Sequence, residues 1–350
     1  MGSVFGHLLK ITSALVVILT LLAYLCPYVN PVRFPWLAFF GTAFPWILLS
    51  NVLLIIIWSL RLNRFALYHV GIILLGWQHV TGFFGFDMTR ATVPENAVTV
   101  ATHNLGGLWR NQQKLTDALR EKTASDYARF LQENGFPDIL CTQETSGKFY
   151  RLLAAKMDYP HTFNLKKGTV ILSRFPMEGG GEIPFGKTAN SSLWVDVQIG
   201  KRTVRVYNVH LQSNKVTNAT QKVMEEAELD EGETWHDIGN VLNKVGDATQ
   251  IRAEQAQLLC DHIAACPHPV IVCGDFNDTP NSYVYGLIAQ GLTDTFREKG
   301  RGFGTTFGGA PPLLRIDYIL TEPSFGTYAC RTVPGQFSDH YPVFASLGIR

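Results

Sequence analysis

Two long stretches without a charged side chain lie near the start of the chain and limit how this part can fold. The first runs from Ile11 to Val29 and the second from Trp36 to Leu60. About 20 consecutive apolar residues match the roughly 30 Å hydrocarbon thickness of a bilayer, so each run predicts a membrane-spanning helix. A third run from Phe65 to Phe86, richer in glycine, predicts another span when its histidines are neutral. We therefore predict a helical membrane domain over residues 1–90, with spans at about 11–29, 36–60 and 65–86.

The basic residues between these runs predict the orientation. Lys10 precedes the first run, and Arg61 and Arg64 follow the second. Because cytoplasmic loops carry the excess of lysine and arginine, three spans would place the rest of the chain on the extracytoplasmic face. Two spans would reverse this orientation. A cleaved signal peptide is the alternative for the first run, but a second apolar run follows after only a short link.

Charge is divided unevenly between the two parts of the chain. Residues 1–90 contain five basic side chains and one acid, which leaves 25 basic and 28 acidic side chains after them, a net charge of about −3. A nucleic-acid-binding domain normally carries a basic surplus, so this balance does not favour such a partner. Six acids within 225–233 belong to a charged insertion at about 213–250. We predict a solvated helix there; a lid or a membrane contact is the alternative.

Polar residues follow or begin several predicted strands of the second part. The apolar run 270–273, for example, is followed closely by Asp275 and Asn277. The whole set is Asn104, Glu144, His210, Asp275, Asn277, Asp317, Asp339 and His340. One polar strand end is usually a turn, but a set of acids, amides and imidazoles predicts a single pocket. Buried carboxylates need a partner, and hard oxygen ligands suit Mg²⁺, with Mn²⁺ or Ca²⁺ as alternatives.

The order of the predicted elements favours two packed sheets. Helices are expected at 123–134, at 252–265 and near 281–290, and residues 192–212 read as a hairpin. Strands alternate with helices in some places and pair as hairpins in others. This mixture fits two face-to-face sheets with helices outside better than a doubly wound parallel sheet.

The segments around the polar strand ends resemble those of the endonuclease/exonuclease/phosphatase superfamily of metal-dependent phosphoesterases. The matching pieces are HNLGG (103–107), QET (143–145), NVHLQ (208–212), GDFND (274–278), RIDYIL (315–320) and SDHYPV (338–343). They occur in the family order and cover roughly 98–348. The resemblance implies a four-layer α/β sandwich, two packed mixed β-sheets flanked by helices, for a catalytic domain over 91–350.

The resemblance also implies a metal site. Glu144 would bind a divalent cation, with Asn104 and Asp339 close to it. Such a cation neutralises charge on the phosphoryl oxygens during hydrolysis.

The remaining residues would carry the proton transfers and hold the phosphate. By resemblance, Asp275 would orient or deprotonate the attacking water, and Asn277 would donate to the phosphoryl oxygens. His340, paired with Asp317, would transfer a proton or steady the pentacovalent phosphate. His210 would donate to the phosphate or protonate the leaving oxygen.

Together these features predict a membrane-anchored, divalent-metal-dependent phosphoesterase that hydrolyses a phosphodiester or phosphomonoester with an activated water. The charge balance, His210 and the anchor favour a phospholipid or phospho-sugar head group as substrate. A membrane-tethered nuclease acting on DNA or RNA is the alternative within this class. From other classes, the alternatives are a non-catalytic membrane scaffold and a transporter with an accessory domain. We predict no organic cofactor and no protein partner.

Overall fold

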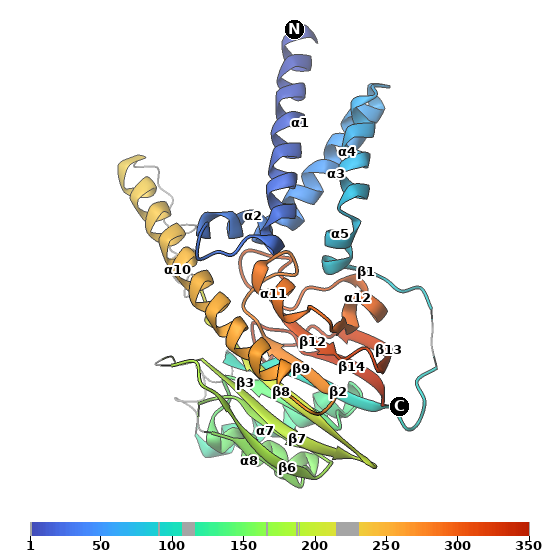
Figure 1. Ribbon diagram of the computed structural model, residues 1–350, viewed down its shortest axis with the longest axis vertical. Helices are drawn as coiled ribbons and strands as arrows, with labels where there is room; N and C mark the ends of the chain where they lie inside the picture. Colours follow the sequence, from blue (N-terminus) through green and yellow to red (C-terminus); the bar gives the residue numbers. More distant parts are fainter. Residues whose placement is uncertain are drawn as a thin grey trace.

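The computed structural model describes residues 2–89, 92–106, 116–165, 167–186, 188, 190–214 and 231–349. Two six-stranded sheets pack face to face, and helices cover their outer faces (Figure 1). This arrangement confirms the expected four-layer sandwich. A set of helices at the start of the chain rises away from the sheets.

The first sheet has the order β13-β14-β2-β3-β5-β4. Its strands are β2 (Val98–Asn104), β3 (Ile139–Gln143), β4 (His161–Asn164), β5 (Val170–Ser173), β13 (Phe325–Thr332) and β14 (Val343–Ile349). The second sheet has the order β10-β12-β9-β8-β7-β6. Its strands are β6 (Met177–Ile183), β7 (Ser191–Ile199), β8 (Arg202–His210), β9 (Val270–Asp275), β10 (Thr293–Asp294) and β12 (Asp317–Thr321).

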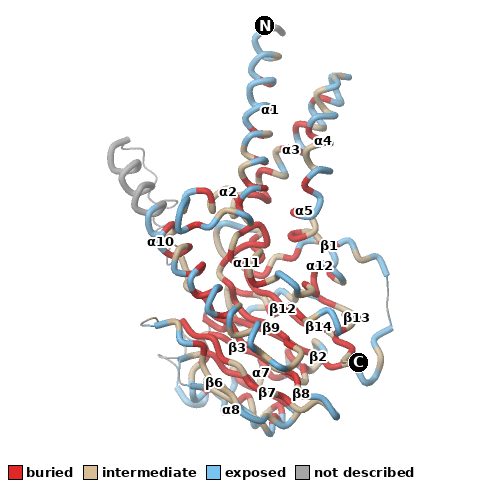
Figure 2. The backbone as a smooth tube through the Cα atoms, viewed as in Figure 1, coloured by how far each residue is buried: buried red, intermediate tan, exposed pale blue. Residues whose placement is uncertain are grey.

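The core lies in three layers because the central strands are buried on both faces (Figure 2). Between the sheets, side chains such as Val100, Val206 and Ile271 form one apolar cluster. Outside the first sheet lie α7 (Asp117–Glu133) and α8 (Gly147–Met157), which pack on the opposite face of its strands. Outside the second sheet lie α10 (Glu231–Ala264) and α11 (Tyr283–Ile288), and α12 (Thr295–Lys299) follows β10. Strands with both faces covered read as continuous apolar runs, as 270–273 does.

The helical part begins with α1 (Gly2–Leu25), η1 (Cys26–Tyr28), η2 (Pro35–Leu37) and α2 (Ala38–Thr42), followed by α3 (Phe44–Leu60), α4 (Phe65–Leu75) and α5 (Trp77–Phe83). Among the described residues, the helix Val4–Tyr28 is long and apolar enough to span a membrane. Only 28% of its apolar window is buried inside the molecule, so it is not a core helix of the sandwich. The remaining surface is available to a bilayer.

The other two apolar runs are interrupted. The run 36–60 forms a pair of helices bent by 53°, which gives a second candidate span only if the pair is one span. The run 65–86 breaks at Gly76, and its end forms a strand, β1 (Phe84–Phe86), that pairs with β11 (Arg301–Phe303). The count of three spans remains a prediction. Inside the helical part, His69 Nδ1 lies 2.8 Å from Asn51 Oδ1, which is the helix–helix hydrogen bond that a polar residue in such a run favours.

The acidic stretch 225–233 lies mostly outside the described residues. The helix expected at 252–265 is the end of α10, which already begins at Glu231 within the charged insertion.

Candidate functional site

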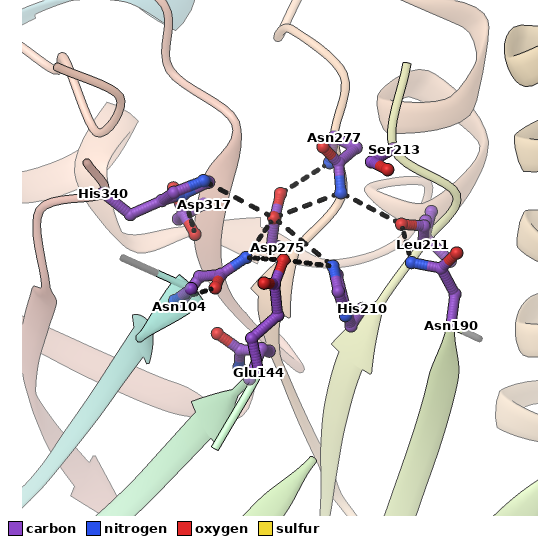
Figure 3. A network of polar contacts seen from close by, with 12 residues as sticks. Asn104, Glu144, Asn190, His210, Leu211, Ser213, Asp275, Asn277, Asp317 and His340 are labelled. Carbon is purple, nitrogen blue, oxygen red and sulfur yellow. Dashed lines mark hydrogen bonds and ion pairs between the residues drawn. The ribbon is translucent and has the colours of Figure 1, made fainter. Parts of the chain in front are cut away.

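Strand pairing brings the predicted residues to one edge of the sandwich. Strands β2 and β3 run parallel, so Asn104 lies at the same end as Glu144, the residue that follows Gln143. Strands β8 and β9 also run parallel, and His210 pairs with Asp275. The antiparallel strand β12 begins at Asp317, opposite Asp275. Because the carboxyl ends of parallel strands meet at one edge, residues more than 200 positions apart in the sequence become neighbours (Figure 3).

Asp275 is the centre of this arrangement. Its Oδ2 accepts from Asn104 Nδ2 at 2.8 Å and from Asn277 Nδ2 at 3.1 Å, and its Oδ1 accepts from the backbone N of Asn277 at 2.8 Å. Burial and the nearby Asp317 carboxylate raise its pKa to about 6, although His340, His210 and Asn104 oppose that rise. Asp275 therefore ionises close to neutral pH, where a general base is most effective.

Glu144 and His210 also lie next to this arrangement around Asp275. Asn104 Nδ2 lies 3.4 Å from Glu144 Oε1, and His210 Nε2 lies 3.7 Å from the same oxygen and 3.9 Å from Asp275 Oδ2. Glu144 and Asn277 both have positive φ, 50° and 52°. Such backbone is uncommon outside glycine and is concentrated at functional sites.

His340 and Asp317 form the predicted pair. His340 Nδ1 lies 3.0 Å from Asp317 Oδ2, and its Nε2 lies 3.9 Å from Asp275 Oδ2. Burial lowers the pKa of His340, but the Asp317 and Asp275 carboxylates outweigh this effect and raise it to about 10. The imidazole is therefore protonated at neutral pH, with Nε2 directed towards Asp275. The Phe307 ring packs edge-on against it at 5.1 Å.

Asp339 lies beside this group rather than at its centre. It is half-buried, and its Oδ1 accepts from Ser338 Oγ at 3.2 Å. Its carboxylate still contributes to the raised pKa of His340. Among the His, Cys, Asp and Glu side chains of the described residues, a group whose ligating atoms lie within 4.8 Å of one another is formed by Asp275, Asp317 and His340. The metal-binding role of Asn104, Glu144 and Asp339 remains a prediction.

The residues fit a divalent cation. The Glu144 and Asp275 carboxylates converge on the Asn104 amide, whose Nδ2 donates to Asp275 Oδ2 at 2.8 Å and lies 3.4 Å from Glu144 Oε1, and carboxylate oxygens are the ligands that Mg²⁺ prefers. Among the described residues, no group hydrogen-bonds the buried His210 Nε2, which lies 3.7 Å from Glu144 Oε1 and 3.9 Å from Asp275 Oδ2. A buried polar atom without a partner is costly, which indicates that another group completes this site.

Gly106 keeps the space for the Glu144 carboxylate, which gives a first prediction. A Cβ at position 106 would lie 2.6 Å from Glu144 Oε2 and 3.3 Å from Asn104 Oδ1. Gly106→Ala should therefore displace Glu144 and weaken Mg²⁺ binding about 10- to 100-fold, as other losses around metal ligands do. Isothermal titration calorimetry with Mg²⁺ measures this loss of affinity. The control is Gly326→Ala, because a Cβ at position 326 would meet open space. Gly179 also has open space around it, but its positive φ would strain an alanine there.

A cleft of about 740 Å³ opens beside Glu144 and His210, and several of its lining residues were not predicted. They include Tyr150, Arg151, Lys167, Asn190 and Ser213. Asn190 Nδ2 and Asn277 Nδ2 both donate to the carbonyl oxygen of Leu211, at 2.8 and 2.9 Å. These residues come from loops and a helix start, where no apolar pattern distinguishes a functional polar residue from a solvated one.

Two polar strand-end residues face between the sheets instead of into the site. Gln143 Nε2 donates to Asn208 Oδ1 at 2.6 Å, and Asn208 Nδ2 donates to the carbonyl oxygens of Thr142 and Val170. Both residues are fully buried. This link joins β8 of one sheet to β3 and β5 of the other directly beneath the site.

Comparison with known proteins gives two sequence matches. A model of the Endonuclease/Exonuclease/phosphatase family matches residues 101–340. A model of a Domain of unknown function (DUF8431) matches residues 6–83. No curated protein sequence matches the chain.

Solved structures share the fold. An endonuclease/exonuclease/phosphatase from Bacteroides vulgatus is 17% identical, over 73% of this chain and 99% of that one, with a TM-score of 0.54. A D. rerio TDP2 humanized by 14 mutations is 15% identical over 73% and 100%, with a TM-score of 0.53. The D. rerio TDP2 complexed with single strand DNA product is 16% identical over 72% and 99%, with a TM-score of 0.50.

Proposed function

We propose that this chain, which belongs to the endonuclease/exonuclease/phosphatase family, is a membrane-anchored phosphoesterase that uses Mg²⁺. Members of the family are metal-dependent hydrolases that act on phosphoester bonds. The observation that carries the proposal is the convergence of Asn104, Glu144 and His210 on the buried Asp275. The proposed division is a helical domain over 1–90 and a catalytic domain over 91–350.

Each residue at this edge has a role in the proposed reaction. Asp275, with a pKa of about 6, accepts a proton from the attacking water. Asn277 Nδ2 donates to the Leu211 carbonyl oxygen and to Asp275 Oδ2, and it would orient a phosphoryl oxygen by exchanging one of these two hydrogen bonds for it. The protonated His340, held by Asp317, stabilises the negative charge that develops on the phosphate. His210 Nε2, for which the described part of the chain offers no hydrogen-bond partner, supplies the leaving oxygen with a proton or a hydrogen bond.

Glu144 and Asn104 would hold the cation, with Asp339 nearby. When bound, Mg²⁺ would neutralise phosphoryl charge and favour ionisation of a water. Mn²⁺ and Ca²⁺ accept the same oxygen ligands.

A phospholipid or phospho-sugar head group is the proposed substrate. The support is the exposed apolar helix Val4–Tyr28, which belongs to the same chain as the site, and the net charge of about −3 over 91–350. The lining of the cleft, with hydroxyl, amide and cationic side chains, suits a polar phosphorylated group. The proposed orientation puts the catalytic domain on the extracytoplasmic face.

A nuclease is the second candidate. The D. rerio TDP2 structure with single strand DNA product has the same fold at 16% identity, and Arg151 and Lys167 could contact phosphates. Against it, Lys167 is paired with Glu182 at 2.6 Å, and the domain lacks a basic surplus.

The test is hydrolysis by the full chain in lipid nanodiscs. Sphingomyelin, phosphoinositides, a sugar phosphate, single-stranded DNA and RNA are compared with Mg²⁺, with EDTA, and with Mg²⁺ restored. We expect metal-dependent release from a lipid or sugar substrate with a higher kcat/KM than for nucleic acid. Faster cleavage of DNA or RNA would make the nuclease the function, and absence of Mg²⁺-dependent hydrolysis with every substrate would favour the scaffold.

A further inference from the structure

The two segments that carry the catalytic acids continue directly into contacts with the helical part. The first is the loop after β9, where Asn281 follows Asp275 by six residues. The second precedes β12, where Arg315 stands two residues before Asp317. Figure 1 shows the helical part standing over α11 and α12, next to these segments. The helices therefore touch the chain on both flanks of the site.

Asn281 is fully buried, and both ends of its amide bind the helical part. Its Nδ2 donates to the carbonyl oxygen of Ala23 in α1 at 3.0 Å, and its Oδ1 lies 2.5 Å from His79 Nδ1 in α5. Because the amide oxygen accepts, His79 Nδ1 must carry the proton and donate. The His79 ring is itself fixed by stacking on Tyr24, with centroids 4.5 Å apart and planes 10° apart.

Close packing surrounds this hydrogen bond. Thr279 Oγ1 donates to the carbonyl oxygen of Gly41 at 3.3 Å. A Cβ at Gly82 would lie 2.7 Å from Pro280 Cβ, and a Cβ at Gly41 would collide with the Asn281 carbonyl. The loop 279–281 therefore fits against the helices without space for a different position.

Arg315 makes the corresponding contact on the other flank. It is buried, and it donates through Nη1 to the carbonyl oxygen of Gly82 at 2.9 Å and through Nη2 to Asp294 Oδ1 at 2.6 Å. The Tyr318 hydroxyl lies 2.8 Å from the Asp278 carbonyl oxygen and 2.7 Å from that of Arg315. The two flanking segments are thus joined to each other as well as to the helices.

We propose that His79 is a positioning residue, which holds Asp275 and Asn277 in their reactive geometry through its hydrogen bond to Asn281. The inference rests on the proposed phosphoesterase function for its kinetic consequence. A displacement of about 1 Å at reacting groups costs about 100-fold in rate, so a buried hydrogen bond six residues from the base is close enough to matter. The helical part is then a component of the catalytic unit as well as an anchor.

The test compares three variants of the full chain in nanodiscs. His79→Ala removes the donor, and His79→Asn keeps an N–H donor near the position of Nδ1. Arg297→Ala is the matched control, because Arg297 joins the same two parts of the molecule through an exposed contact with Gln78 and Thr81. Two readouts are used: hydrogen–deuterium exchange of residues 274–282, and kcat and KM for bis(p-nitrophenyl) phosphate with Mg²⁺.

For His79→Ala we expect exchange of this segment to rise about 10-fold and kcat to fall about 10- to 100-fold, with KM changed by less than about 3-fold. His79→Asn should recover most of both, and Arg297→Ala should match the wild type. Should His79→Ala fail to fold, the isosteric Thr279→Val should show the same changes at a smaller scale. Wild-type exchange in His79→Ala, or equal changes in Arg297→Ala, would overturn the inference. If the wild type does not hydrolyse the diester, the proposed function is at fault, and the exchange data alone decide the positioning role.

Discussion

Replacing Asp275 by asparagine is expected to lower kcat by about 10³- to 10⁴-fold, at the upper end of the contribution of a positioned acid–base group. The Asp275 carboxylate accepts three hydrogen bonds from Asn104 and Asn277. An asparagine at position 275 could accept only some of them, because its NH₂ group would face a donor in place of the second carboxylate oxygen. The substitution also removes the only group at this position that can take a proton from water. A chromogenic phosphodiester with Mg²⁺ measures the loss.

Asp126→Asn is the control for this substitution. Asp126 is on the surface of α7, where it pairs with Lys122 at 2.7 Å, so its removal changes the formal charge equally without touching the site. Wild-type kcat is expected there. A loss of less than about 10-fold in Asp275→Asn, with the fold intact by circular dichroism, would show that another residue is the base.

The sequence was sufficient to predict the catalytic sandwich because its central strands are buried on both faces. Runs such as 270–273 stand out as apolar segments, and the polar residue that follows each run marks the strand end. The strands that were missed are short or lie at sheet edges. The strand β4 is only partly buried, and β6 contains three consecutive glycines, so neither has an apolar pattern.

The geometry of the site was less accessible from the sequence. The motifs identify Asp339 and His340 together, but only the fold shows that His340 enters the group with Asp275 and Asp317 while Asp339 lies beside it. The lining of the cleft was also missed. A single Asn190 or Lys167 in a loop has no periodicity, and its position becomes visible only when β5, β7 and β8 are assembled.

The helical part shows a similar limit. Hydropathy indicates the length of an apolar run but not where it bends, so the break at Gly76 and the pairing of β1 with β11 could not be predicted. His79 reads as a polar residue within such a run, for which helix–helix bonding is expected. Its partner, Asn281, is 202 positions away in a loop of the sandwich, and no local pattern connects the two.

Replacing Asp317 by asparagine should change the pH dependence of the reaction as well as its rate. The Asp317 carboxylate is the strongest of the charges that raise the pKa of His340 to about 10. Without it, the Asp275 and Asp339 carboxylates are left to oppose the effect of burial, so the pKa falls and the imidazole loses its proton at lower pH. The alkaline limb of the kcat profile should move down by at least about one pH unit, and the loss of kcat relative to the wild type should grow as pH rises towards 10.

The protonation of His340 should also change the stability of the folded protein. Because the folded-state pKa of His340 lies above its unfolded value of about 6.5, the pair contributes stability that is fully present below that value and is lost as pH rises through about 10. The melting temperature of Asp317→Asn should therefore lie below that of the wild type at pH 6, and the difference should shrink towards pH 10. Phe307→Leu, which removes the ring packed on His340 but no charge, should leave the alkaline limb in place. An unmoved limb in Asp317→Asn would mean that a group other than His340 must stay protonated for phosphoester hydrolysis.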